Sequence, residues 1–250
     1  MAEFEGPRTA IVTGGAKRIG AAICRALAED GWHLLIHCLH SRREAQALAE
    51  EVGNARVVTA DLASPTAAEE VFGALAGMPP AKLLVNNASR FTFDAADDFN
   101  AEGWAQHLDI NLRAPALLSQ AFARAAAGGL IVNLLDAKLA NPNPDFFTYT
   151  VSKMGLAGLT ELTARAYAAR GIRVCGIAPS VTLVSGPQSR DNFEAVHRLN
   201  ALERGVDVAE IVAALRFLIA TPTITGQTIT LDAGQRFLGL PRDVQFLEPE

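Results

Sequence analysis

Short apolar runs rich in β-branched residues alternate with longer amphipathic stretches along the whole chain of 250 residues. A short apolar run followed by a stretch of helical period is typical of a βαβ unit. Because such units lay parallel strands side by side and place helices over them, the pattern predicts an α/β fold. We expect a doubly wound parallel sheet of about seven strands with helices on both faces.

The expected strands are residues 10–13, 33–37, 57–60, 83–86, 130–135, 173–178 and 228–231. The expected helices are residues 19–30, 42–52, 65–75, 101–111 running on through 127, 149–169 and 208–220. Strands and helices alternate strictly, and no repeat, low-complexity tract or Gly/Ser linker divides them. We therefore expect residues 1–250 to form a single domain.

Two segments, residues 180–202 and 237–250, have no clear period. The first follows the carboxyl end of an expected strand, which is the edge where α/β sheets bind their ligands. We therefore interpret residues 180–202 as a lid or substrate loop.

Composition favours a small-molecule site. Half of the residues are hydrophobic, which indicates a well-filled core. The net charge of −5 disfavours a nucleic-acid or anionic-membrane partner. Cys24, Cys38 and Cys175 are an odd number without metal-ligand spacing, and the five histidines form no ligand pair, so we expect no metal and read the cysteines as buried thiols in a reducing compartment.

The location expected from the sequence is the cytoplasm. Residues 1–8 carry acidic side chains and lead at once into a strand, which argues against a cleaved signal. No apolar run approaches the roughly 18 residues that a membrane-spanning helix needs.

A glycine-rich turn follows the first expected strand. The chain runs through Thr13-Gly14-Gly15-Ala16-Lys17-Arg18-Ile19-Gly20 and then into a helix. Small residues let the backbone approach a pyrophosphate, and the helix N-terminus offers amide donors and a positive dipole end. We interpret this turn as a dinucleotide site, and the alternative is a plain turn between strand and helix.

The end of the second strand indicates which dinucleotide. An NAD site usually places a carboxylate there to accept the ribose hydroxyls. This chain reads His37-Cys38-Leu39-His40-Ser41-Arg42-Arg43 and has no acid until Glu44. Together with Lys17 and Arg18, these residues suit a 2′-phosphate, so NADPH/NADP+ is the expected cofactor. Arg42 and Arg43 are equally compatible with a solvated first helical turn.

Polar residues near later strand ends allow two interpretations each. Asp61, followed by Leu62, could accept from the adenine amine or cap a turn. Asn87 in Asn86-Asn87-Ala88-Ser89 could line the cofactor or brace neighbouring loops. Asn111 is a poor helix former inside a long expected helix, which predicts a bend or a water-holding role.

The pair Tyr149 and Lys153 predicts proton-transfer chemistry. Residues at i and i+4 share a helix face, so the lysine would lie beside the phenol and lower its pKa by favouring the phenolate. Such a tyrosine is a usable proton donor near neutral pH. Asp136 lies thirteen residues before Tyr149, at the end of an apolar run. The alternatives are a surface Tyr-Lys pair and an aspartate that caps a loop.

These motifs together resemble the short-chain dehydrogenase/reductases and, within them, the pteridine reductases. The family pattern T-G-x-x-x-G-x-G appears with Arg18 at its middle glycine, a form found in pteridine reductases. Ser89-Arg90-Phe91 follows the family's N-N-A, and Asp136 replaces the family's serine, both again as in pteridine reductases. The segment 37–41 resembles their 2′-phosphate loop. The resemblance implies a Rossmann-like fold and an NADPH-dependent reductase acting on a pterin or dihydropterin.

Motifs and resemblance together give three sets of expected site residues. The catalytic set is Asn111, Asp136, Tyr149 and Lys153. The cofactor set is Gly14, Lys17, Arg18, Ile19, Gly20, His37, His40, Ser41, Asp61, Leu62, Asn87, Ala88, Ser89, Tyr149, Lys153, Pro179 and Thr182. The substrate set is Arg18, Ser89, Phe91, Asp136 and Tyr149.

The chemistry of Asp136 agrees with a pterin. A carboxylate repels a developing alkoxide, so Asp136 disfavours reduction of a simple ketone. A pterin instead offers N–H and amine donors that a carboxylate accepts. Phe91 could stack on the ring or belong to the core, and Arg18 could bridge cofactor and pterin or contact a phosphate alone.

Two alternative functions are also compatible with the sequence. One is a short-chain reductase of another small carbonyl or imine, with Asp136 incidental. The other is a non-catalytic NADP(H)-binding sensor, although binding alone needs no proton donor. Apolar, alanine-rich faces on residues 112–127 and 151–169, together with the resemblance, imply a homotetramer or homodimer.

Overall fold

Seven parallel strands form one sheet in the computed structural model, which describes residue 4, residues 6–185 and residues 188–247. The strands are β1 (Thr9–Val12), β2 (His33–Cys38), β3 (Ala55–Thr59), β4 (Ala81–Asn86), β5 (Gly129–Leu134), β6 (Ile172–Pro179) and β7 (Thr228–Leu231). Their order is β3-β2-β1-β4-β5-β6-β7, and each neighbouring pair is parallel. The predicted single-domain, doubly wound α/β fold is confirmed.

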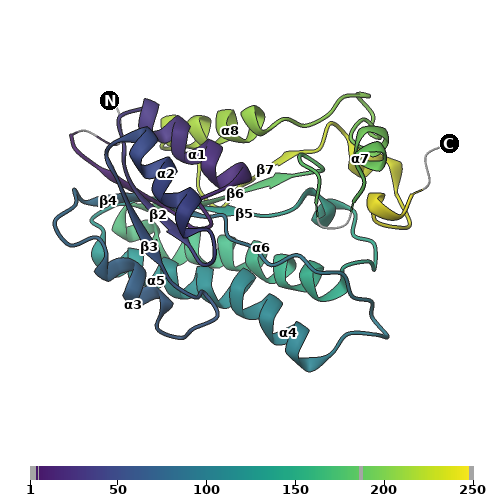
Figure 1. Cartoon of the computed structure of the whole chain (residues 1–250), viewed down its shortest axis with the longest axis horizontal. Helices are drawn as coiled ribbons and strands as arrows, with labels where there is room; N and C mark the ends of the chain where they lie inside the picture. The colour runs from purple at the N-terminus through teal and green to yellow at the C-terminus, as the bar shows by residue number, and fades with distance from the viewer. Residues whose placement is uncertain (1–3, 5, 186–187, 248–250) are drawn as a thin grey trace.

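Helices cover both faces of this sheet, as Figure 1 shows. One layer contains α1 (Arg18–Glu29), α2 (Arg42–Val52) and α8 (Val208–Ala220). The opposite layer contains α3 (Ala67–Gly73), α5 (Ala114–Ala125) and α6 (Phe147–Tyr167), with α4 (Ala101–Leu108) packed beside α6. None of the helices in the described part of the chain is long and apolar enough to cross a membrane.

The inner strands of the sheet are largely apolar because both of their faces are buried. In β1, Ala10 and Val12 pack into the core beneath α1 and α8, whereas Ile11 points to the core beneath α5. All three side chains are fully buried. Successive residues of a strand face opposite sides, so a sheet covered on both faces needs an unbroken apolar run rather than alternation.

The strand order determines where on the sheet a ligand can bind. Connections from β1 lead outward to β2 and β3, whereas β4 lies on the other side of β1. Loops at the carboxyl ends of β1 and β4 therefore diverge and leave a crevice, which is where doubly wound sheets bind ligands.

Three elements differ from the sequence-based expectation. The expected helix over 101–127 is broken into α4, a π-helical turn η1 (Asp109–Arg113) and α5, so an irregularity at Asn111 is confirmed. Residues 190–196, expected to lack regular structure, form the short helix α7 (Arg190–Val196). The tail contains the turns η4 (Gln235–Leu238) and η5 (Val244–Phe246). Residues 186–187 and 248–250 of the two aperiodic segments lie outside the described residues.

Candidate active site

The turn after β1 forms a cradle that admits no larger side chain. Gly14 has a φ of 60°, a left-handed conformation that glycine adopts without strain. A Cβ on Gly20 would lie 2.2 Å from the carbonyl oxygen of Gly14 and 2.7 Å from the side-chain nitrogen of Asn87. The backbone is thus free to meet a ligand, and α1 begins at this turn with its amide groups directed to it.

Asn87 and His37 hold the cradle in place. The Asn87 amide donates to the carbonyl oxygens of Thr13 (2.8 Å) and Gly14 (3.1 Å). The buried His37 ring accepts from the Gly14 N–H through Nδ1 (3.2 Å) and donates from Nε2 to the Ala60 carbonyl (2.9 Å). Burial lowers the pKa of His37, so its ring is neutral at physiological pH. His37 therefore braces the loop rather than supplying a cation to a phosphate.

A cavity of about 400 Å³ extends from this cradle. It is lined by Gly14, Lys17, Arg18, Ile19, Gly20, His37, Leu39, Asp61, Leu62, Asn87, Ala88, Ser89 and Ile110. His40 and Ser41, expected in the cofactor set, are not part of this lining, and Ser41 instead begins α2. Leu39 and Ile110 are additions that carried no polar signal in the sequence. The glycine cradle and the basic side chains fit a dinucleotide phosphate group.

Two polar residues that line this cavity, Asp61 and Lys17, also bond to other parts of the chain. Asp61 accepts from the Ala63 N–H (2.9 Å), so it caps a turn while it also lines the cavity. Lys17 forms an exposed ion pair with Glu44 (2.5 Å). Between the end of β2 and Glu44, the chain carries no carboxylate.

Arg18 occupies the position where the resembling family has a glycine, and it keeps the glycine's conformation. Its φ is 54°, which costs a non-glycine residue roughly 1–2 kcal/mol. The guanidinium donates to the Val184 carbonyl (2.8 Å) and lines a second cavity as well as the first. Strain held at such a place is typical of a functional position.

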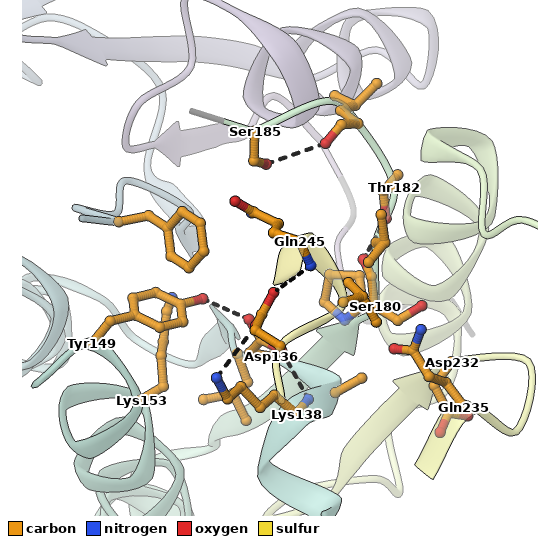
Figure 2. A pocket seen from close by; sticks show the side chains of 18 of the residues that line it. Asp136, Lys138, Tyr149, Lys153, Ser180, Thr182, Ser185, Asp232, Gln235 and Gln245 are labelled. Carbon is orange, nitrogen blue, oxygen red and sulfur yellow. Dashed lines mark hydrogen bonds and ion pairs between the residues drawn. The ribbon is translucent and has the colours of Figure 1, made fainter. Parts of the chain in front are cut away.

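The second cavity, of about 290 Å³, adjoins the first and contains three of the four expected catalytic residues. Both cavities share the lining residues Arg18, Ile19, Asn87 and Ser89. Asp136, Tyr149 and Lys153 lie on its wall, as Figure 2 shows. A ligand in one cavity would thus meet a ligand in the other at these four shared residues.

Tyr149 and Asp136 are directly hydrogen-bonded. The Tyr149 hydroxyl donates to Oδ2 of Asp136 at 2.7 Å, and the Lys138 backbone N–H donates to Oδ1 at 2.8 Å (Figure 2). Lys153 Nζ donates to the Leu134 carbonyl at 2.7 Å and lies 5.7 Å from the centroid of the Tyr149 ring. The spacing of these residues in the sequence therefore does place them in one site.

The direction of the Tyr149 pKa corrects one expectation. Burial, and then the charge and hydrogen bond of Asp136, raise the pKa of Tyr149 well above its ordinary value. The prediction from the sequence that Lys153 lowers this pKa is therefore wrong in direction. Burial also lowers the pKa of Lys153 to about 8, with Asp136 opposing the shift. The phenol accordingly keeps its proton at neutral pH.

The start of α6 determines where Tyr149 lies. Phe146 has a left-handed φ of 52°, which turns the chain into the helix. Asp94 then caps the helix by accepting from the Thr148 N–H (2.9 Å) and from the Thr148 hydroxyl. Thr148 also bonds to the buried His107 (2.6 Å). This network places Tyr149 in the first turn of α6, facing the cavity.

Asn111 acts on the neighbouring loop. Its Oδ1 accepts from the Arg90 N–H (2.8 Å) and the Ser89 hydroxyl (3.2 Å), and its Nδ2 donates to the Arg90 carbonyl (2.9 Å) and Ser152 Oγ (3.0 Å). It lines neither cavity. The geometry thus gives Asn111 a positioning role between the π-helical turn, the loop after β4 and α6, rather than contact with a reacting group.

Phe91 contributes both to the core and to the cavity. Its ring stacks on Phe146 at 4.2 Å between centroids and meets Tyr149 edge-on at 4.7 Å. It is nevertheless 36% exposed and lines the second cavity together with Ser89. Both interpretations of this residue are therefore compatible with the structure.

Much of the second cavity comes from segments without sequence motifs. Pro179 and Thr182, which belong to the expected cofactor set, line this second cavity and not the first. Ser185 and Gln188 lie in the segment 180–202 that is expected to form a lid or substrate loop. Residues that sequence reasoning missed include Lys138, Gln235 and the tail residues Leu240, Arg242, Asp243, Val244 and Gln245. These residues have no period and no motif, so only the folded chain brings them to the site.

The chain belongs to the short chain dehydrogenase family, which residues 8–194 match. The Homo sapiens protein "Dehydrogenase/reductase SDR family member 4" is 31% identical and covers 91% of this chain and 87% of its own length. A D-threitol dehydrogenase from Mycolicibacterium smegmatis is 32% identical and covers 91% of this chain and 92% of its own length.

A solved structure is similar over nearly the same length. FolM Alternative dihydrofolate reductase 1 from Brucella canis, complexed with NADP, has a TM-score of 0.88 and 38% sequence identity. The match covers 92% of this chain and 94% of that one. The expected family and fold are thus confirmed.

We predict that Lys153→Met stabilises the protein at pH 7. The pKa of about 8 in the folded protein lies below the unfolded value of about 10.4, so the folded state binds fewer protons between these two pH values. Wild-type stability therefore rises with pH through this window. Below this pH window, the wild-type protein bears the full cost of burying the lysine charge. Removing the charge should therefore raise the free energy of unfolding by about 2 kcal/mol at pH 7.

Chemical denaturation at pH 7 and near pH 10.5 measures this effect. The gain should shrink to a small value at the higher pH, because the wild-type lysine is then neutral in the folded state and about half neutral in the unfolded state. A destabilised variant at pH 7, or a gain that does not change with pH, would contradict the assignment of Lys153 as a buried, costly cation.

Proposed function

We propose that this chain is an NADPH-dependent reductase that transfers hydride to a ring C=N of a pterin or dihydropterin. One observation supports this most strongly: the proton-bearing Tyr149 hydroxyl is hydrogen-bonded to the carboxylate of Asp136 on the wall of the second cavity. A carboxylate at this place suits a substrate that offers N–H groups, and it opposes a substrate that develops an alkoxide.

NADPH is the cofactor that the first cavity suits. When bound, a reduced nicotinamide supplies hydride. In this chain the Gly14–Gly20 cradle would hold the pyrophosphate, and Lys17 and Arg18 would face the 2′-phosphate. The solved structure from Brucella canis was complexed with NADP, which supports the same choice. Lys153 and Tyr149 would position the nicotinamide ribose where the two cavities meet.

Tyr149 supplies the proton. A ring nitrogen becomes strongly basic as hydride reaches the neighbouring carbon, and it then takes a proton from an acid within hydrogen-bond reach. The raised pKa of Tyr149 keeps that proton available at neutral pH. Asp136 accepts N–H or amine donors of the ring as a carboxylate, and when it is protonated it acts as a second proton donor to a ring nitrogen.

The other substrate contacts follow from the lining. Arg18 and Ser89 lie where cofactor and substrate would meet, and Phe91 offers a flat apolar surface. Residues 180–202 would act as a lid, because Ser180 to Leu183 line the substrate cavity. A structure similar to this chain is described as an alternative dihydrofolate reductase, and dihydrofolate carries a dihydropterin ring.

The leading rival is reduction of another small carbonyl or imine. The similarity to a D-threitol dehydrogenase supports this rival, because D-threitol is an alcohol and its dehydrogenation produces a carbonyl group. Asp136 argues against it. A sensor that binds NADP(H) without turnover is the other alternative, and the hydrogen-bonded pair Tyr149 and Asp136 argues against it, because binding alone needs no proton donor.

The proposal predicts that the purified protein oxidises NADPH with a dihydropterin and not with simple ketones. Absorbance of NADPH, followed with a dihydropterin and with a panel of ketones, measures this. Turnover of a ketone but of no pterin would refute the proposal in favour of the first rival. Binding of NADPH without turnover of any compound would favour the sensor.

Two variants locate the chemistry within the same assay. Asp136→Ser should lower kcat/KM for the dihydropterin by about 100-fold and raise turnover of a ketone, because the negative charge is exchanged for a hydroxyl donor. Tyr149→Phe should abolish both reactions while NADPH binding persists. Equal pterin turnover by the wild type and Asp136→Ser would remove Asp136 from the mechanism.

Assembly into a homotetramer or homodimer also belongs to the proposal. On α6, Leu162 is 67% exposed and Met154 is 44% exposed, and on α8 Phe217 is 50% exposed. Apolar side chains at these places would be covered by a second copy. Sedimentation velocity should therefore give a species of at least twice the 26.5 kDa chain, and a monomer would contradict this.

A further inference from the structure

The C-terminal tail, defined here as residues 240–247, forms one wall of the substrate cavity. Leu240, Arg242, Asp243, Val244 and Gln245 all line it. Figure 1 shows the tail beside α7, beyond the carboxyl ends of the strands. The tail is therefore close to Tyr149 in space although it is far from it in sequence.

Asp145 anchors the tail from the loop that precedes α6. Its buried carboxylate accepts from Arg242 Nε (2.7 Å) and from the Asp243 backbone N–H (2.7 Å). Hydrogen bonds to a charged group are stronger than neutral ones. Both bonds involve the same carboxylate oxygen, which fixes the direction in which the chain enters the tail.

Lys138 and Phe246 provide two further anchors. Lys138 Nζ bonds to the Asp145 carbonyl (2.5 Å) and to Asp243 Oδ2 (3.3 Å), and both ionic side chains are largely buried. Phe246 packs against Phe93 (5.0 Å between centroids) and Phe146 (5.8 Å). Because the backbone of Lys138 also holds Asp136, the tail is joined to the turn that orients this carboxylate.

Gln245 differs from the other glutamines of the cavity. Gln235 donates to the Leu199 carbonyl (3.3 Å), and Gln188 donates to Asn192 Oδ1 (2.9 Å). The backbone of Gln245 is held by Asp243 Oδ1 (3.1 Å), but its carboxamide has no hydrogen-bond partner among the described residues. Figure 2 shows this side chain extending away from the tail ribbon among the residues that line the cavity.

A carboxamide presents a donor beside an acceptor, and it pairs with a ring edge that shows the complementary pair. Glutamine recognises adenine in this bidentate way. The lactam and amino edges of a pterin have the same kind of pattern. We propose that Gln245 is a substrate-binding residue that recognises such an edge, while Tyr149 and Asp136 act at the reacting part of the ring.

This inference rests on the proposed function, and it adds a specificity-determining residue on the tail. The anchors at Asp145, Lys138 and Phe246 hold the carboxamide in position before the substrate arrives. Binding then orders few additional groups, which favours affinity.

Gln245→Met tests the inference, because methionine keeps the length of the side chain and removes both hydrogen-bonding groups. Loss of two hydrogen bonds should raise KM for a dihydropterin about tenfold. We expect kcat and the affinity for NADPH, measured by fluorescence titration, to stay within about twofold of the wild type. Gln245→Glu, which keeps an acceptor and loses the donor, should give an intermediate KM.

Gln46→Met is the matched control. Gln46 lies on α2, lines neither cavity, and bonds to the exposed Glu50, so its substitution should leave KM unchanged. A wild-type KM in Gln245→Met would overturn the inference. So would a fall in kcat or in NADPH affinity as large as the rise in KM, since that would indicate a loosened tail. A wild-type protein that turns over no dihydropterin would refute the proposed function and this inference together.

Discussion

The hydrogen bond between Tyr149 and Asp136 is the interaction on which the rest of the site depends. It joins a phenol and a carboxylate inside a cavity, where an unpaired carboxylate would be costly. Asp136 is fixed by the backbone of Lys138, and Tyr149 by the Asp94 cap at the start of α6. Asp136 follows β5 and Tyr149 lies in α6, so this bond forms only when the fold places the end of β5 beside the start of α6.

Positively and negatively charged side chains surround this bond, and most of them pair with one another or with backbone groups of the chain. Lys153 lies on one side and Lys138 on the other, and Asp243 and Asp145 then bind Lys138 and Arg242. Buried charges of this kind contribute little net stability, because desolvation offsets their attraction. They do give each group one position. We infer that stability is given up here for a fixed arrangement of donors and acceptors.

The fold could be predicted from the sequence more fully than the site. Buried parallel strands such as β5 are mainly apolar, which the sequence shows directly. A glycine is required at Gly20 because a Cβ there would collide with the backbone of Gly14. The tail could not be predicted, because Arg242 reaches Asp145 only through the completed fold. The spacing of Tyr149 and Lys153 predicted their proximity correctly but gave the wrong direction for the tyrosine pKa, because spacing carries no information about burial.

The pKa of Tyr149 tests the central claim most directly. The chain has two tyrosines, so in a Tyr167→Phe protein the ultraviolet absorbance of phenolate reports Tyr149 alone. We predict that Tyr149 ionises well above the ordinary value of about 10 and that its pKa falls when Asp136→Asn is added. Ionisation at or below about 10, or a pKa that Asp136→Asn leaves unchanged, would contradict the account.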